Sequence, residues 1–174
     1  KGQYIDMSQV EKGVIFNAPD MLDYVVNKRV ANRMGNRFPY AAPHGAYTCC
    51  GDERWCVIAV FTDTEWKSFC KVIGNPAWTK DAKFSTLLER KKNEDELDRL
   101  VEEWTTNHSP EEVMSMMQAA GVAAGVVQNP EDLMEHDPQL KHRNSFPEVE
   151  HAEVGKYHPP GPVSYTHLTL PTKR

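Results

Sequence analysis

The stretch from Arg33 to Gly45, RMGNRFPYAAPHG, constrains the fold of this chain more than any other part of it. A helix-like run precedes this stretch and the most strand-like run of the sequence follows it. Pro39 and Pro43 fix their own φ and restrain the residues before them, and Gly35 permits a φ that a side chain would oppose. We therefore expect a stiff loop that joins two structured blocks.

Two interpretations of this loop remain open from the residues alone. Binding groups tend to lie on loops that a rigid scaffold positions, whereas a plain linker between domains has a similar composition. His44 is the candidate substrate-facing histidine of the loop, because imidazole titrates near neutral pH. Four basic residues could meet a phosphate or a carboxylate or remain solvated, namely Lys28, Arg29, Arg33 and Arg37.

Composition narrows the class of protein. The chain has 174 residues, of which 40% are hydrophobic and 26% charged, as is typical of a soluble globular protein. No apolar run has the length of a membrane span. A net charge of −5 argues against nucleic acid as the main partner. The sequence shows no signal peptide and starts without methionine, so we expect a fragment of a cytoplasmic protein.

The first half of the chain carries clear local signals. Ser8 and Glu11 have the spacing of a capping box, which predicts a helix from residue 8, with a restart at Pro19 and an end near residue 27. Two strand-like runs, 45–50 and 55–61, flank a turn at 51–54, which predicts a hairpin. The second run is apolar at successive positions, so we expect a strand that is covered on both faces.

The second half alternates helices with short extended segments. Thr62 and Glu65 predict a helix that Gly74 ends in a left-handed conformation. We expect a continuous helix over 86–107, whose charged residues at 94–103 form a solvated surface. Ser109 starts a further helix, followed by a strand at 122–127, a brief helix from 129 and candidate strands at 146–149 and 154–157. Few strands and segregated helices indicate a small α+β domain over 45–128.

No local motif for nucleophilic, phosphate-binding or metal chemistry is present. Cys49, Cys50, Cys56 and Cys70 form no C-x-x-C pair, and we expect reduced thiols. The sequence predicts no metal site, because nothing fixes the spread histidines on one face of a regular element; these are His136, His142, His151 and His158.

An ordered series of segments from Gly2 to about Pro162 resembles the family III CoA-transferases, the CaiB/BaiF group. The series is GQYIDMS at 2–8, RMGNRFPYAAPHGAY at 33–47, GNPAW at 74–78, DAKFSTLLERKKNEDEL at 81–97 and AGVAAGVVQNPEDLMEHDPQL at 120–140. The sequence is most similar in character to the members that act on aromatic or branched dicarboxylic acyl-CoAs, such as the benzylsuccinate CoA-transferases.

The resemblance implies a division of the chain within an α/β fold. Residues 1–27 would be a remnant of the large Rossmann-like CoA-binding domain, and 28–44 a linker with the substrate-facing loop. Residues 45–128 would be the small α+β domain, and 129–162 the return linker. Residues 163–174 resemble the translation of a sequencing adapter, so we expect a non-native tail.

The resemblance also implies an activity. Family members move CoA between an acyl-CoA and a carboxylic acid through an aspartyl-CoA thioester, as interlocked homodimers, with CoA as substrate and no permanently bound cofactor. The nucleophilic aspartate lies upstream of the segment that matches 2–8, so Asp6 is not its counterpart and we expect this chain alone to be inactive. By the same resemblance, the loop closes over the acyl site with Gly35, Asn36, Arg37, Tyr40 and His44.

Two alternatives remain. An α-methylacyl-CoA racemase of the same superfamily would also have its acid and base residues upstream. A non-enzymatic helical interaction domain would be a compact monomer, whereas a fragment would expose apolar patches on the helix over 8–27.

Overall fold

A computed structural model describes residues 2–158. Its centre is an antiparallel sheet in the order β1-β2-β3, formed by His44–Thr48, Trp55–Ala59 and Ala123–Val126. β1 pairs with β2 from His44↔Ala59 to Thr48↔Trp55, and the turn between them closes with a 2.8 Å hydrogen bond from Cys49 N to Arg54 O. The predicted hairpin and the predicted strand at 122–127 are therefore confirmed.

Four helices accompany the sheet: α3 (Asp63–Val72), α4 (Leu87–Lys92), α5 (Glu94–Thr105) and α6 (Pro110–Ala119). Two 3₁₀ turns, Ala77–Lys80 and Ala82–Phe84, connect α3 to α4. The capping boxes at the starts of α3 and α6 both form. Gly74 has φ +83°, as expected for the residue that ends α3. These local predictions are confirmed.

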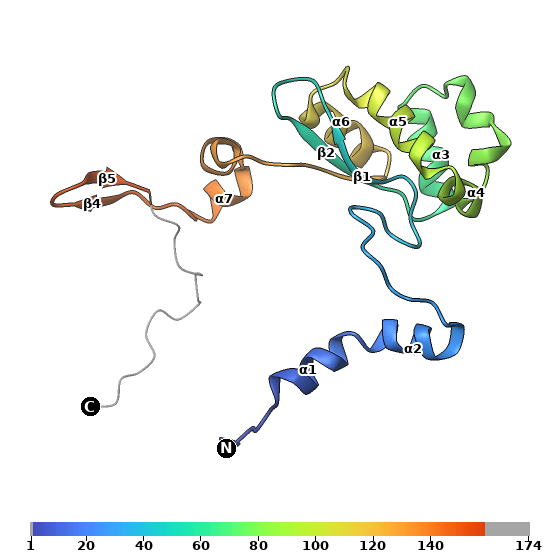
Figure 1. Ribbon diagram of the computed structural model, residues 1–174. Coiled ribbons are helices and arrows are strands. Elements are labelled where there is room, and N and C mark those ends of the chain that lie inside the picture. Colours follow the sequence, from blue (N-terminus) through green and yellow to red (C-terminus); the bar gives the residue numbers. More distant parts are fainter. Residues whose placement is uncertain (1, 159–174) are drawn as a thin grey trace.

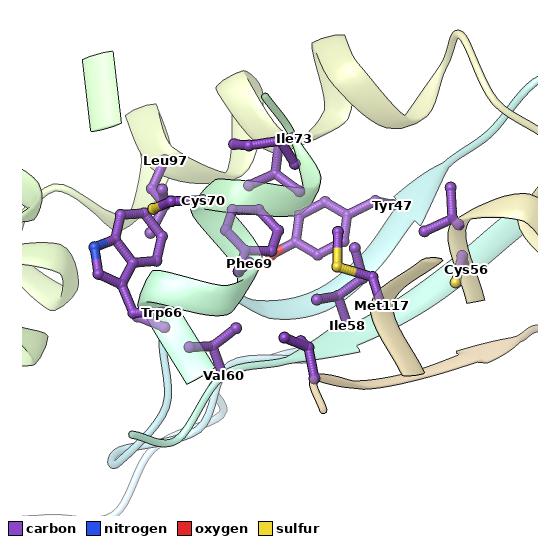
Figure 2. Close-up of a cluster of buried hydrophobic side chains, with 14 of the residues drawn as sticks. Tyr47, Cys56, Ile58, Val60, Trp66, Phe69, Cys70, Ile73, Leu97 and Met117 are labelled. Carbon is purple, nitrogen blue, oxygen red and sulfur yellow. The ribbon is translucent and has the colours of Figure 1, made fainter. Parts of the chain in front are cut away.

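The core lies between the helices and one face of the sheet. Figure 2 shows Phe69 and Trp66 of α3 together with Tyr47, Ile58 and Met117. Phe69, Ile58 and Met117 are at most 1% exposed. Burial of such side chains contributes roughly 1.5–3 kcal/mol each to folding. The mixed helix and sheet class expected from the sequence is confirmed.

The prediction of one continuous helix over 86–107 is wrong. α4 ends at Lys92 and α5 begins at Glu94, with Asn93 between them at φ −111° and ψ 28°. The Asn93 side-chain amide donates to Lys83 O at 3.2 Å and to Glu89 O at 2.9 Å. Such side-chain bonds to backbone carbonyls compete with helix continuation. The result is an elbow between α4 and α5.

The prediction that the second strand is covered on both faces is also wrong within the described residues. Cys56 and Ile58 of β2 are buried, whereas Trp55 and Val57 are 36% and 44% exposed. Side chains alternate between the two faces of a strand, and the helices that contact the sheet cover only the face of Cys56 and Ile58. The sheet therefore has one open face.

The segments on either side of this domain contact it little (Figure 1). Helices α1 (Gln9–Phe16) and α2 (Ala18–Asn27) form where predicted, and neither buries a residue. Of the two bonds of the predicted Ser8 capping box, the structure shows Glu11 N donating to Ser8 Oγ. Ile15 and Val25 are 72% and 63% exposed, so both helices present apolar residues to solvent.

The C-terminal part combines a π-helical turn, Asp132–His136, with α7 (Pro138–His142) and a hairpin of β4 (Val149–His151) and β5 (Gly155–Tyr157). Arg54 ties this part to the domain through Asp132 at 2.5 Å. The strand predicted at 154–157 is confirmed, whereas the one predicted at 146–149 overlaps β4 at Val149 alone. In residues 2–158 there is no helix with the length and apolar character needed to cross a membrane. The predicted non-native tail, 163–174, lies outside the described residues.

Candidate functional site

A pocket of about 590 Å³ lies on the open face of the sheet, against the loop that precedes β1. Gly35, Asn36 and Arg37 form its loop side. Its sheet side consists of His44, Gly45, Ala46, Val57, Ile58, Ala59, Ala123, Ala124 and Gly125. A volume of this size suits a small-molecule substrate.

Strand register explains the sheet side of the pocket. Ala46 pairs with Val57, and Val57 pairs with Gly125 on the other neighbour. Directly opposed residues share a face, so the side chains of Ala46 and Val57 point away from the core, on the face where Gly125 adds none. Because most of these positions carry small residues, the space above the sheet remains open. Apart from His44, sequence reasoning missed this half of the site, although the small residues at 123–125 could have indicated it.

The loop is closely ordered by its own backbone. Gly35 has φ +61°, a conformation that favours glycine. Arg37 N donates to Met34 O at 3.1 Å, and a β-bridge joins Phe38 to Ala41. The loop backbone is therefore hydrogen-bonded to itself at two places.

His44 is the first residue of β1, and its ring is held by contacts with the loop. Its Nδ1 lies 2.5 Å from Asn36 O. Because a carbonyl oxygen can only accept, Nδ1 carries the proton, and the Nε2 of a neutral ring is then an acceptor. The ring stacks on Phe38 with centroids 5.6 Å apart and meets Phe61 edge-on at 6.0 Å. His44 can therefore accept a hydrogen bond or a proton from a group in the pocket.

Arg37 lines the same pocket, but its guanidinium already forms ion pairs with carboxylates of this chain. Nη2 donates to Asp95 at 2.5 Å and to Asp98 at 3.0 Å, and Nε lies 3.7 Å from Glu94. The bond to Asp95, together with that to Asp98, raises the pKa of Arg37 above its ordinary value. Arg37 is thus better placed to hold the loop than to bind an anionic substrate.

The carboxylates around Arg37 correct the sequence prediction for residues 94–103. This run is not simply a solvated surface, since the Glu94 side chain is 6% exposed and Glu102 accepts from Thr48 Oγ1 at 2.6 Å. A second cavity of about 460 Å³ lies beside the first and includes Asp95, Asp98 and Glu102 in its lining.

The structure therefore brings four of the five predicted site residues to one pocket. Gly35, Asn36, Arg37 and His44 line it. Tyr40 does not; its side chain is 70% exposed and contacts Phe38 edge-on at 5.9 Å. Of the basic cluster, Arg29 pairs with Asp23 at 2.7 Å, and Lys28 donates to Val25 O at 3.1 Å.

The polar groups of the pocket lining come from Asn36, Arg37 and His44 and the backbone. Among the described residues that line it there is no carboxylate, hydroxyl or thiol. The site as it stands can donate and accept hydrogen bonds and hold an apolar group. Among the described residues that line it, the imidazole of His44 is the one side chain with a nucleophilic atom.

Comparison with curated proteins yields named CoA-transferases. The chain is 34% identical to a probable CoA-transferase of Mycobacterium tuberculosis, over 99% of this chain and 22% of that protein. It is 29% identical to a succinyl-CoA–D-citramalate CoA-transferase of Chloroflexus aurantiacus, over 90% and 38% of the two chains. It is 23% identical to the human succinyl-CoA:glutarate CoA-transferase, over 100% and 39%. The chain thus spans well under half of each relative.

Comparison with solved structures supports the same fold. A CaiB/BaiF family protein from Brucella suis matches with a TM-score of 0.69 and 25% identity, over 95% of this chain and 42% of that one. Residues 1–173 match the family described as CoA-transferase family III. The fold is that of the CaiB/BaiF proteins, and the chain belongs to CoA-transferase family III.

Proposed function

We propose that this chain forms the small domain and adjoining segments of a transferase that moves CoA between an acyl-CoA and a carboxylic acid. The observation that carries the proposal is the family match over residues 1–173 in a chain whose predicted loop lines a substrate-sized pocket. The curated relatives described above are CoA-transferases by name.

The reaction we propose runs through a carboxylate outside this chain. That aspartate attacks the thioester carbonyl, the C–S bond breaks, and CoA leaves as a thiolate, so that the acyl group and the aspartate form a mixed anhydride. The thiolate then attacks the aspartyl carbonyl, which gives an aspartyl-CoA thioester and releases the first acid. The second acid reverses both steps and leaves with CoA. Covalent catalysis of this kind divides one difficult transfer into easier steps.

The loop contributes groups that suit the acyl end of these intermediates. The Asn36 side-chain amide and the His44 ring both belong to the pocket lining. A donor such as an asparagine amide typically contributes several kcal/mol to catalysis when it is aimed at a developing oxyanion, whereas the Nε2 of a neutral His44 accepts. The apolar sheet floor, with Val57 and Ala59, can hold the body of the acyl group.

The proposal extends to assembly. The chain covers 22% of the M. tuberculosis relative and 39% of the human one, so we propose that the complete activity needs the remaining part. The exposed apolar faces of α1 and α2 support docking on that part. We propose an interlocked homodimer in the cytoplasm, with CoA as a substrate and no permanently bound cofactor. The 174-residue chain alone is expected to be inactive.

The test uses the longer protein that carries this chain, incubated with succinyl-CoA and a second carboxylic acid. New acyl-CoA, detected by mass spectrometry, is the expected product. Hydroxylamine should convert the enzyme-bound thioester to a hydroxamate on an aspartate outside the 174 residues. A hydroxamate on a residue of this chain, or racemisation of a branched acyl-CoA without transfer, would overturn the mechanism.

A further inference from the structure

We propose that the elbow between α4 and α5, residues 90–98, sets the geometry of the pocket loop, with Arg90 and Lys91 as positioning residues for Asn36 and His44. The link between this geometry and catalysis rests on the proposed function. The structural part of the inference stands on contacts within this chain.

Lys91 fixes the loop at Phe38. Its Nζ donates to Phe38 O at 2.9 Å and to both Glu94 carboxylate oxygens at 2.8 and 2.7 Å. The Lys91 and Glu94 side chains are 20% and 6% exposed, so water competes weakly for the bonds between them, and the ammonium is held beside the more exposed Phe38 O. Because the Phe38 ring stacks on His44, holding the Phe38 backbone also holds the histidine ring.

Arg90 fixes the other end of the loop. It is fully buried, and its Nε donates to Ala42 O at 3.0 Å, two residues before His44. Nη1 donates to Phe84 O at 3.3 Å, and the guanidinium lies 4.7 Å from the Trp66 ring centroid. A buried cation is tolerated when its donors are hydrogen-bonded. For Arg90, the partner of the Nε donor is the loop carbonyl of Ala42.

The elbow lets α4 contact the loop at Ala42 and Phe38 while α5 binds the loop at Arg37. Arg90 and Lys91 belong to the last turn of α4, whereas Glu94 and Asp95 open α5. Before Asn93, the side chains of Arg90 and Lys91 donate to loop carbonyls. After Asn93, the Asp95 carboxylate pairs with the guanidinium of the loop residue Arg37. The loop is held at Arg37, Phe38 and Ala42, all of which lie in the segment that the 2.5 Å contact between Asn36 O and His44 closes.

The first test measures amide hydrogen exchange in the 174-residue chain. Lys91→Met removes the ammonium and keeps much of the apolar side chain. The amide of Ala41 donates to Phe38 O, the carbonyl that Lys91 binds. Loss of a charged hydrogen bond should speed exchange at Ala41 about tenfold, while the amides paired between β1 and β2 stay within twofold of wild type.

Two further variants make this test decisive. Lys92→Met is the matched control, because Lys92 is 59% exposed and pairs with Glu89 alone among the described residues. Lys91→Arg keeps a donor and should restore slow exchange at Ala41. Unchanged exchange in Lys91→Met, or equal acceleration of loop and strand amides, would overturn the inference.

The second test measures CoA transfer by the longer protein. Lys91→Met should lower kcat about tenfold and leave KM for the acyl-CoA within twofold, with Lys92→Met at the wild-type rate. A loosened loop with unchanged kcat would overturn the catalytic link alone. Absence of transfer in the wild type would instead overturn the proposed function, whatever the exchange experiment shows.

Discussion

Replacing Arg90 by methionine should destabilise the domain by about 2–4 kcal/mol, an energy that follows from the contacts of the guanidinium. Arg90 is the donor to the carbonyls of Ala42 and Phe84, and both of these residues are 0% exposed. Each buried carbonyl left without a partner costs about 1–3 kcal/mol. Loss of the contact with Trp66 adds about 1 kcal/mol. The ion pair with Asp63 adds little, since that carboxylate is 64% exposed.

One effect opposes this loss. Burial lowers the pKa of Arg90, which shows that the folded state disfavours its charge, and methionine removes that penalty. The net effect stays destabilising because methionine cannot donate to the two carbonyls. Arg90→Lys should fall between wild type and Arg90→Met, since an ammonium lacks the planar fork of the guanidinium.

Urea unfolding followed by tryptophan fluorescence measures these differences, with Trp66 beside the substituted position. Arg99→Met is the control, because Arg99 is 63% exposed and pairs with an exposed Glu103. The control should change the free energy of unfolding by less than about 0.5 kcal/mol. If Arg90→Met unfolds within the same margin, the guanidinium does not hold Ala42 and Phe84 as described.

Two further predictions concern titratable groups in the core. Of the four cysteines, Cys50 is exposed and should be alkylated by iodoacetamide at pH 8 in the folded chain. Burial raises the pKa of Cys56 to about 12 and that of Cys70 to about 11, so mass spectrometry should find both unmodified until urea is added. Burial and the nearby Asp98 carboxylate raise the pKa of Tyr47 above its ordinary value, so its phenol stays protonated when folded. The unfolded chain therefore releases this proton first, and the associated stability, complete below about pH 10, is lost as pH rises further. The urea midpoint should fall less between pH 9 and 11 in Tyr47→Phe than in wild type, and identical slopes would contradict this.

The predictions that succeeded depend on residues close together in the sequence. A capping box needs only Thr62 and Glu65, and both of its bonds are present. The hairpin likewise follows from two strand-like runs and a short turn. The loop was found because two prolines restrict its backbone and Gly35 permits a φ that other residues disfavour.

The predictions that failed depend on distant partners. The break at Asn93 involves the carbonyl of Lys83, ten residues away. A local signal was also present, since Asn93 precedes Glu96 with the spacing of a capping box, although the Asn93 side chain makes no cap bond. Asp95 meets an arginine 58 positions earlier, which helix periodicity does not indicate. Val57 is exposed because the helices cover the opposite face of the sheet, and an apolar run does not reveal which faces are covered.

The strands' contribution to the pocket was missed for a related reason. Ala46, Val57 and Gly125 meet only through strand pairing across some 80 positions of sequence, the separation of residues 46 and 125. The resemblance to the family located the loop but not the sheet residues that form the floor of the pocket. Strand register, once known, assigns the floor residues by alternation.

The central claim is that the loop before β1 presents His44 to the acyl group during CoA transfer. The most direct measurement compares kcat/KM for CoA transfer by the longer protein and its His44→Ala variant, with His142→Ala on α7 as control. Since His44 lines the pocket and positioned acid–base or hydrogen-bonding groups typically contribute at least about 100-fold, His44→Ala should lose activity on that scale. The control should keep the wild-type rate. Equal rates for His44→Ala and wild type would contradict the account.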